Sequence, residues 1–513
     1  MGLSKQQEVL LVAALYLVIL WFWTLPLQSN PLPYGEVDAA SHYAVAEYTA
    51  SADRSITTLP PYIDVRYGDD NRFKEHTLWY PPPFHTALAM AGVFGGNIDL
   101  SIFLLNAVLC SLIVLGVYFL MRSLYGFEAG FMSAALVGFS MRDILVFMWG
   151  QWPERFGFAF LPLILYCFYQ YTSSYLDGNR KPIYVYLLGL LLAANLFIHP
   201  MDFFHAVAAL IVVSVFFLIK ERKLFFHLAD VCITILIFLL VIALFPFQTM
   251  NVLAQATGGG EVNDPSAVGD WSRLFAWYRT PGTDVGAPAA YFSYSQMVAP
   301  LWTALFVLLG IAYLLLKRDR KALVLLGWLV SLYLMLHIDI LGMGRGHRSL
   351  SATAHLFFPL MVLGTLFLAS FVPENQKSLA KKWAPLIFGI IVLFFIVPPA
   401  FSTLSHAYEG VNRVTPAQSE MSLWMRSLPA ENSLFHLGSI SLAKTRWISM
   451  VGHHYVLNNG FENGGFEYVI LDASDASQLG NPQFLQSLQQ QAQAFANVTP
   501  AYERPPIWVY PWN

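Results

Sequence analysis

Two carboxylates and a histidine lie close together just after the first apolar run of this chain. Glu36 and Asp38 are two residues apart, and His42 follows Asp38 by four, so a helix beginning near Asp38 would place Asp38 and His42 on one face. Carboxylates in such a position can take a proton from a hydroxyl group, or hold a divalent cation, since hard cations prefer oxygen ligands. The simpler alternative is that Asp38 only caps the helix.

A second acidic group, Glu154, comes after the segment Trp149-Gly150-Gln151-Trp152-Pro153 and stands beside Arg155. Ionisable residues at the edge of a bilayer are costly and are usually functional. We therefore predict that Glu154 belongs to the same site as Asp38. The alternative is that Glu154 and Arg155 pair with each other or extend to the lipid headgroups.

A third segment, between two apolar runs late in the chain, carries Arg345, His347 and Arg348 among glycines. Glycines let the backbone approach a ligand closely, and the planar guanidinium of arginine suits phosphate oxygens. This segment therefore predicts an anion pocket at headgroup depth. Non-specific binding of lipid phosphate is the alternative.

The composition shows which elements must position these groups. Of the 513 residues, 56% are hydrophobic and 12% are charged, against roughly a quarter charged in soluble proteins, which excludes a soluble enzyme. The net charge of −3 leaves no basic surface for nucleic acid. About eleven apolar runs are near the length of a membrane span; they lie near 8–28, 101–121, 128–146, 155–174, 183–198, 203–219, 226–246, 298–316, 322–341, 352–372 and 383–404.

Lys and Arg residues concentrate in the connections on the same side as the N-terminus, such as 317–321 and 377–382. The positive-inside rule then predicts a multi-pass cell-membrane protein with a cytoplasmic N-terminus. An odd number of spans places loops 29–100 and 247–297 and the C-terminal tail outside the cell. We predict that loop 247–297 is either a lid over the substrate or an inert connection.

The tail differs from the rest of the chain because polar, Gln-rich and Asn-rich stretches separate its short apolar runs. The sequence predicts two domains, a membrane domain at 1–404 and a small extracytoplasmic α/β domain at 405–513. Its helix-like and strand-like segments alternate; they lie at 416–428, 433–437, 455–457, 467–472, 481–495 and 507–510.

These motifs together resemble the GT-C superfamily of membrane glycosyltransferases, and within it the oligosaccharyltransferase catalytic subunits and their archaeal and bacterial relatives. The likeness consists of Asp38-x-x-x-His42, Tyr80-Pro81-Pro82, an acidic second external loop at Glu154, the helix led by Arg348, and Ser422-Leu423-Trp424-Met425-Arg426 at the start of the tail. The resemblance implies a polytopic helical fold with a small external C-terminal domain.

The resemblance also implies the roles of the residues. The acid of the first loop, Asp38 with Glu36 beside it, would act as base or bind a divalent cation such as Mg²⁺ or Mn²⁺, and Glu154 would join it. Arg348, with Arg345 or His347 helping, would hold the phosphate of a polyprenyl-phosphate-linked sugar. The acceptor would be a glycan, a glycolipid or a protein, and a single displacement would invert the anomeric carbon.

Two rival functions stay open at this point. A transporter or flippase would move a lipid-linked sugar without chemistry, and it predicts ionisable groups near the middle of several spans. A catalytically inactive scaffold with a receptor-like tail is the other. The enzyme hypothesis predicts that Asp38, Glu154 and Arg348 converge on one external cavity that is open to lipid.

Overall fold

The fold is known from a computed structural model. It describes residues 4–51, 60, 62, 83–246, 294–337, 346–406, 413–429, 433–437, 442–457, 466–474, 486, 489–490 and 492–512. Loop 247–293, the Tyr80-Pro81-Pro82 motif, Arg345 and most of the helix expected at 481–495 lie outside these residues. The predictions made for them therefore stay predictions.

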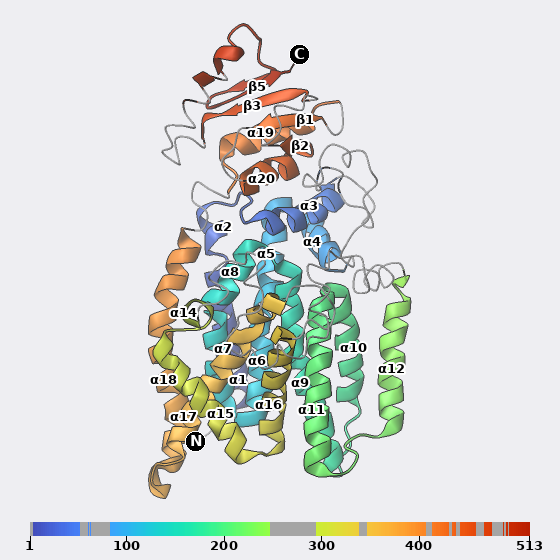
Figure 1. The fold of residues 1–513 in the computed structure, drawn as a ribbon, viewed down its shortest axis with the longest axis vertical. Coiled ribbons are helices and arrows are strands. Elements are labelled where there is room, and N and C mark those ends of the chain that lie inside the picture. The colour runs from blue at the N-terminus through green and yellow to red at the C-terminus, as the bar shows by residue number, and fades with distance from the viewer. Residues whose placement is uncertain are drawn as a thin grey trace.

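A bundle of long helices forms most of the molecule, and a smaller domain sits on one end of it (Figure 1). The bundle is built from α1 (Lys5–Trp23), α5 (Ile98–Ser111), α6 (Ile113–Tyr125), α7 (Phe127–Gly138), α8 (Met141–Trp149), α9 (Trp152–Leu176), α10 (Ile183–Ile198), α11 (Pro200–Glu221), α12 (Leu228–Ala243), α15 (Ala304–Lys317), α16 (Arg320–His337), α17 (Thr353–Ala369) and α18 (Glu374–Ser405). The short α14 (Tyr294–Met297) and η7 (Leu301–Thr303) precede α15.

Helices occur at each position where an apolar run predicted one. Within the described residues, six helices are long and apolar enough to cross a membrane, or seven if α7 and α8 form one bent span. The outer helices expose large apolar side chains, for example Leu240 on α12 (58% exposed) and Phe394 on α18 (76%). Such apolar surface is expected where a protein meets lipid. The number of spans remains a prediction.

Ion pairs cluster at the end of the bundle that carries the N-terminus. Glu8 of α1 accepts from the Arg122 guanidinium at 2.6 Å, and Arg320 binds both Asp177 and Glu221 at 2.7 and 2.8 Å. The C-terminal domain lies at the opposite end (Figure 1). The N-terminus and the C-terminal domain therefore lie at opposite ends of the bundle, as an odd number of spans requires. Which end faces the cytoplasm stays a prediction.

The third apolar run, expected as one span near 128–146, is broken. Helix α7 ends at Gly138, and α8 continues after a bend of 43°. The Ser140 side chain accepts from the amide of Asp143 at 3.3 Å, and Gly150 closes α8 with φ +91°. A serine N-cap and a left-handed glycine are strong helix boundaries. Arg142 and Asp143 thus lie on a buried helix.

Short helices form a layer between the bundle and the C-terminal domain. They are α2 (Leu25–Ser29), α3 (Val37–Ser51) and α4 (Pro83–Phe94), and Figure 1 shows α3 beneath the domain. Helix α4 packs against α3 and α5.

The C-terminal domain has helices α19 (Pro416–Arg426) and α20 (Leu442–Gly452) and a five-stranded sheet. The strands are β1 (Leu434–Leu437), β2 (Tyr455–Leu457), β3 (Tyr468–Asp472), β4 (Tyr502–Arg504) and β5 (Ile507–Pro511), in the order β2-β1-β3-β5-β4. Strand β1 pairs in parallel with β2 and β3, while β5 is antiparallel to β3 and β4. The sequence predicts α19 and four strands correctly, but it misses α20 and β4.

The C-terminal domain holds α3 near both of its ends. The Trp447 indole donates to the carbonyl of Gly35 at 2.7 Å. Near the other end, Arg426 donates to Oε1 of Glu47 at 2.9 Å, and His453 Nε2 lies 2.6 Å from its Oε2. Burial raises the pKa of Glu47, but the hydrogen bond to His453 and the charge of Arg426 outweigh it and hold the pKa below its ordinary value. Glu47 is therefore ionised at neutral pH.

Candidate active site

Asp38 lies in the first turn of α3, which begins at Val37. Glu36 occupies the position before the helix, and its carbonyl accepts the first helical hydrogen bond, from Ala40 at 3.3 Å. Both acids are half-buried, and no hydrogen bond or ion pair joins the Asp38 side chain to the described part of the chain. The structure therefore shows no capping hydrogen bond from Asp38 within the described residues, and the choice between a cap and a catalytic acid stays open.

The start of α3 packs directly on the turn between α8 and α9. The amide of Glu36 donates to the carbonyl of Met148 at 3.3 Å. At Gly150 a Cβ would lie 1.9 Å from the backbone nitrogen of Ala39, and Gly150 has φ +91°. Only glycine allows both this contact and this backbone conformation without strain. The contact brings the Asp38 backbone to the turn that leads to Glu154.

Glu154 lies in the first turn of α9, after a proline at the helix start. Its residue is 1% exposed and Arg155 is 0% exposed, so neither side chain extends to the lipid headgroups. Burying a carboxylate costs free energy unless hydrogen bonds or charges compensate it. Buried ionisable residues in membrane proteins are usually functional. The burial of Glu154 therefore supports a functional role for this acid.

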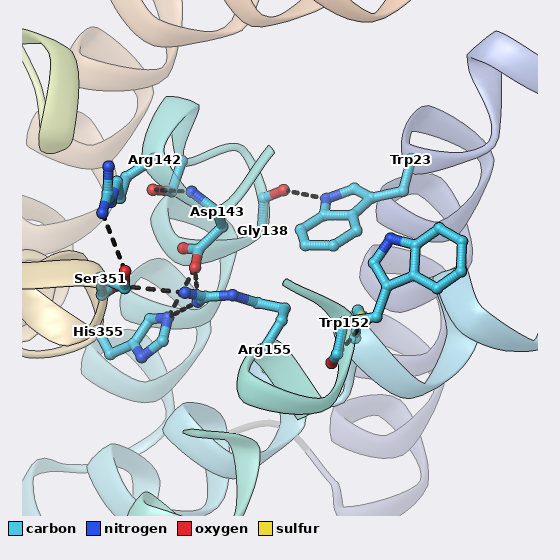
Figure 2. Close-up of polar contacts among 10 residues, drawn as sticks. Trp23, Gly138, Arg142, Asp143, Trp152, Arg155, Ser351 and His355 are labelled. Carbon is cyan, nitrogen blue, oxygen red and sulfur yellow. Dashed lines mark hydrogen bonds and ion pairs between the residues drawn. The ribbon is translucent and has the colours of Figure 1, made fainter. Parts of the chain in front are cut away.

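Arg155 belongs to a buried network that sequence reasoning missed (Figure 2). Its guanidinium binds the carboxylate of Asp143 on α8. Nε2 of His355 on α17 lies 2.5 Å from Nη1 of Arg155 and 2.8 Å from Oδ1 of Asp143. Arg142 donates to the hydroxyl of Ser351 at 2.9 Å. These five residues are at most 1% exposed, so they fix α8, α9 and α17 relative to one another.

The segment expected to bind phosphate forms a short 3-10 helix, η8 (Gly346–Ala352). Its backbone carries His347 and Arg348, while their side chains and all of Arg345 lie outside the described part of the chain. Ser351 of η8 contacts α8 through Arg142 and accepts at its carbonyl from Arg155 of α9 at 3.3 Å. The backbone that carries Arg348 is thus attached to the same two helices as Glu154.

The turn between α10 and α11 adds a third buried acid to this region, after Glu154 and Asp143. Asp202 is 1% exposed, and its Oδ2 lies 3.2 Å from Nδ1 of His199. At Gly157, one turn after Glu154, a Cβ would lie 2.0 Å from Oδ2 of Asp202. Asp202 therefore packs against the face of α9 that follows Glu154.

His42 does have the expected spacing from Asp38, but its ring contacts another histidine. Nδ1 of His42 lies 2.9 Å from Nε2 of His85 on α4. Burial, and then the charge of His42, lower the pKa of His85 well below its ordinary value, so His85 is neutral at neutral pH. No sequence pattern indicates this pair, because His42 and His85 are 43 residues apart.

The described residues contain no group of three or more His, Cys, Asp or Glu side chains that could hold a metal ion. Asp38 and Glu154, the two expected ligands, therefore do not form a complete site with other described side chains. Their role in binding a divalent cation remains a proposal. The site as described supplies carboxylates and guanidinium groups.

Comparisons with known proteins concern the fold. The sequence profile of a family of unknown function, DUF6541, matches residues 6–351. No curated protein matches the chain. Among solved structures, the Archaeoglobus fulgidus oligosaccharyltransferase tethered to an acceptor peptide with the sequon NVT has a TM-score of 0.56 at 13% identity, over 93% of this chain and 72% of the other.

A second solved relative covers almost the whole of both chains. ArnT from Cupriavidus metallidurans in the apo state has a TM-score of 0.53 at 11% identity, over 98% of this chain and 97% of the other. The same protein bound to undecaprenyl phosphate gives 0.50 at 12% identity, over 99% and 98%. Both relatives are GT-C glycosyltransferases, so the expected GT-C-like helical membrane fold is confirmed.

Proposed function

The chain belongs to the DUF6541 family, whose function is unknown, and we propose from its fold and site that it is an inverting membrane glycosyltransferase. It moves a sugar from a polyprenyl-phosphate-linked donor to an acceptor at the external face of the membrane. The structural neighbours are glycosyltransferases, which supports a GT-C type of enzyme. One neighbour binds undecaprenyl phosphate and another an acceptor peptide, which supports a lipid-linked donor and a separate acceptor.

The observation that carries the proposal is the packing of the Asp38 backbone on the α8–α9 turn. It joins the half-buried acid of the first loop to the helix of Glu154, and α8 and α9 in turn hold η8 with Arg348. These contacts support a site formed by three segments that are far apart in the sequence. A carboxylate and a guanidinium on opposite sides of one bond are what a sugar transfer from a phosphate requires.

In the proposed reaction an oxygen of the acceptor attacks the anomeric carbon while the bond from that carbon to the phosphate oxygen breaks. Asp38, assisted by Glu36, takes the proton of the acceptor hydroxyl. Arg348, with Arg345 or His347, stabilises the negative charge on the leaving polyprenyl phosphate. A single displacement inverts the configuration of the anomeric carbon. His42 would support Asp38 from the next turn of α3.

A divalent cation, Mg²⁺ or Mn²⁺, would be held by Asp38 and Glu154 if the enzyme uses one, because both provide hard oxygen ligands. It would supply positive charge near the donor phosphate. The described residues do not complete its coordination, so the roles given above to the side chains do not depend on it.

A transporter or flippase for a lipid-linked sugar is the alternative function. It predicts ionisable groups near the middle of several spans. Within the buried ionic network, Arg155 is the fourth residue of α9 and His355 the third of α17, while Asp143 follows the break between α7 and α8. This placement favours chemistry near one surface of the membrane.

The test is the substitution Asp38→Asn, with Asp177→Asn as a matched control. Asp177 is exposed at the other end of the bundle, where it binds Arg320. The purified variants are incubated in vesicles with polyprenyl-phosphate-linked sugars and with glycan, glycolipid and peptide acceptors, and release of polyprenyl phosphate is measured. We expect Asp38→Asn to lower the rate by about 100-fold or more, the typical contribution of a general base, at unchanged expression. Equal rates in Asp38→Asn and the wild-type protein would remove Asp38 from the mechanism.

A further inference from the structure

Two serines of η8 are held by buried side chains of other helices. The hydroxyl of Ser349 lies 2.7 Å from Nε2 of His205 on α11. Two residues later, the hydroxyl of Ser351 accepts from Arg142 of α8, and its carbonyl accepts from Arg155 of α9. Together these contacts join η8 to three helices of the bundle.

The groups that hold η8 are themselves fixed. Arg142 lies over the Trp149 ring with 5.4 Å between the guanidinium carbon and the ring centroid, a cation–π contact. Arg155 is bound by Asp143. Because Arg142, Arg155 and Ser351 are all 0% exposed, their hydrogen bonds are not weakened by water and have charged donors, which makes them stronger than neutral ones.

A 3-10 helix has poorer hydrogen-bond geometry than an α-helix and is seldom long, so contacts from outside determine where η8 lies. Arg348 directly precedes Ser349 and comes three residues before Ser351. Its backbone is therefore placed by the two serines. The helices that hold Ser351 also form the turn on which the start of α3 packs, so one rigid unit sets the separation between Asp38 and the Arg348 backbone.

We propose that Ser349 and Ser351, with His205 and Arg142, are positioning residues that hold η8 so that Arg348 can bind the phosphate of a polyprenyl lipid. The nature of the ligand rests on the function proposed above, while the clamping of η8 does not. None of the four residues needs to touch the substrate. Removing one of their hydrogen bonds should free η8 and weaken phosphate binding without unfolding the protein.

The experiment compares Ser351→Ala with the conservative variant Ser351→Thr and the control Ser133→Ala. Ser133 on α7 is also 0% exposed, and its hydroxyl has no hydrogen-bond partner in the described part of the chain. The first measurement is amide hydrogen exchange of residues 346–352 in the purified full-length protein. We expect exchange about tenfold faster in Ser351→Ala, since a hydrogen bond from a charged donor is lost, and no change in Ser133→Ala.

The second measurement is the Kd for undecaprenyl phosphate in lipid nanodiscs. We expect Ser351→Ala to raise it about tenfold, as one charged hydrogen bond would, and Ser351→Thr to restore binding by keeping the hydroxyl. In an Arg348→Ala background, Ser351→Ala should have no further effect, because the group it positions is gone. A purely structural role would instead lower the amount of folded protein and leave the Kd unchanged.

The outcomes separate the two proposals. Unchanged exchange in Ser351→Ala would overturn the clamp, whatever the ligand. Faster exchange with a Kd equal to that of the wild-type protein would show that the clamp does not position a phosphate ligand, and would overturn the inference. A wild-type protein that does not bind undecaprenyl phosphate would overturn the lipid-phosphate donor and with it the positioning role, while hydrogen exchange would still decide whether η8 is clamped.

Discussion

The contact between Gly150 and the start of α3 leads to a sharp prediction for the substitution Gly150→Ala. The new methyl group would lie 1.9 Å from the nitrogen and 2.4 Å from the Cα of Ala39. Both are backbone atoms, so no side-chain rotation can relieve the overlap. The start of α3 would have to move away from the α8–α9 turn, and Asp38 would move with it.

Two terms set the size of the effect. A non-glycine residue in the left-handed conformation costs about 1–2 kcal/mol, and inserting a methyl group into packed structure costs roughly 1–3 kcal/mol more. Gly178 separates them, because it has φ +76° but nothing within 4 Å of its Cβ position. Gly178→Ala should therefore show the conformational cost alone. The difference between the two variants, about 1–3 kcal/mol, measures the contact.

Thermal unfolding in detergent gives the stabilities, and donor cleavage in vesicles gives the rates. A displacement of about 1 Å at a catalytic group can cost about 100-fold in rate, so we expect Gly150→Ala to lose activity far beyond its loss of stability. Gly178→Ala should keep wild-type activity. If the two variants have the same stability and the same activity, the start of α3 does not rest on the α8–α9 turn and the reasoning that places Asp38 beside Glu154 is wrong.

Two further predictions concern the ion pairs. Arg155→Gln should lower the free energy of unfolding by about 3–5 kcal/mol, because it leaves the buried carboxylate of Asp143 without its cation. Arg122→Gln should lower it by only about 0–1 kcal/mol, because the Arg122 side chain is 47% exposed. Thermal unfolding of both variants checks this difference. The pKa of Glu47 is lower in the folded protein than the unfolded value of about 4.3, so its ion pair contributes stability above that pH, and the contribution disappears as the pH falls through the folded pKa. Unfolding measured at pH 7 and near pH 3 should therefore show a smaller difference in Glu47→Gln than in the wild-type protein, and an equal difference would contradict this sign.

The sequence predicts the helices well because their signal is local. A run of apolar residues of bilayer length is enough to locate a helix such as α11 or α16, and a short run of β-branched and aromatic residues is enough for β3 and β5. The break between α7 and α8 was missed because the apolar run continues through it. The deciding features, Ser140 as N-cap and Gly150 as C-cap, are short signals inside a longer hydrophobic pattern.

The site could be predicted only in part, because residues that pair over long sequence separations show no regular spacing in the sequence. Asp38 and Glu154 stand out as acids at the edges of apolar runs. Asp143 and Arg155 are 12 residues apart, and His355 is 200 residues from Arg155, so no periodicity connects them. The available signal was a charged residue within an apolar run. Such a signal identifies one residue of a pair but does not indicate its partner.

The contacts between the C-terminal domain and α3 couple the movements of the two. Trp447 holds the residue before the helix, and Arg426 and His453 hold Glu47 near its far end, so helix and domain should shift as a single body. A binding partner that tilted the C-terminal domain would move the start of α3, which carries Asp38, relative to the turn that leads to Glu154. If the chain has the proposed activity, such a partner would slow it without competing for the lipid or the sugar.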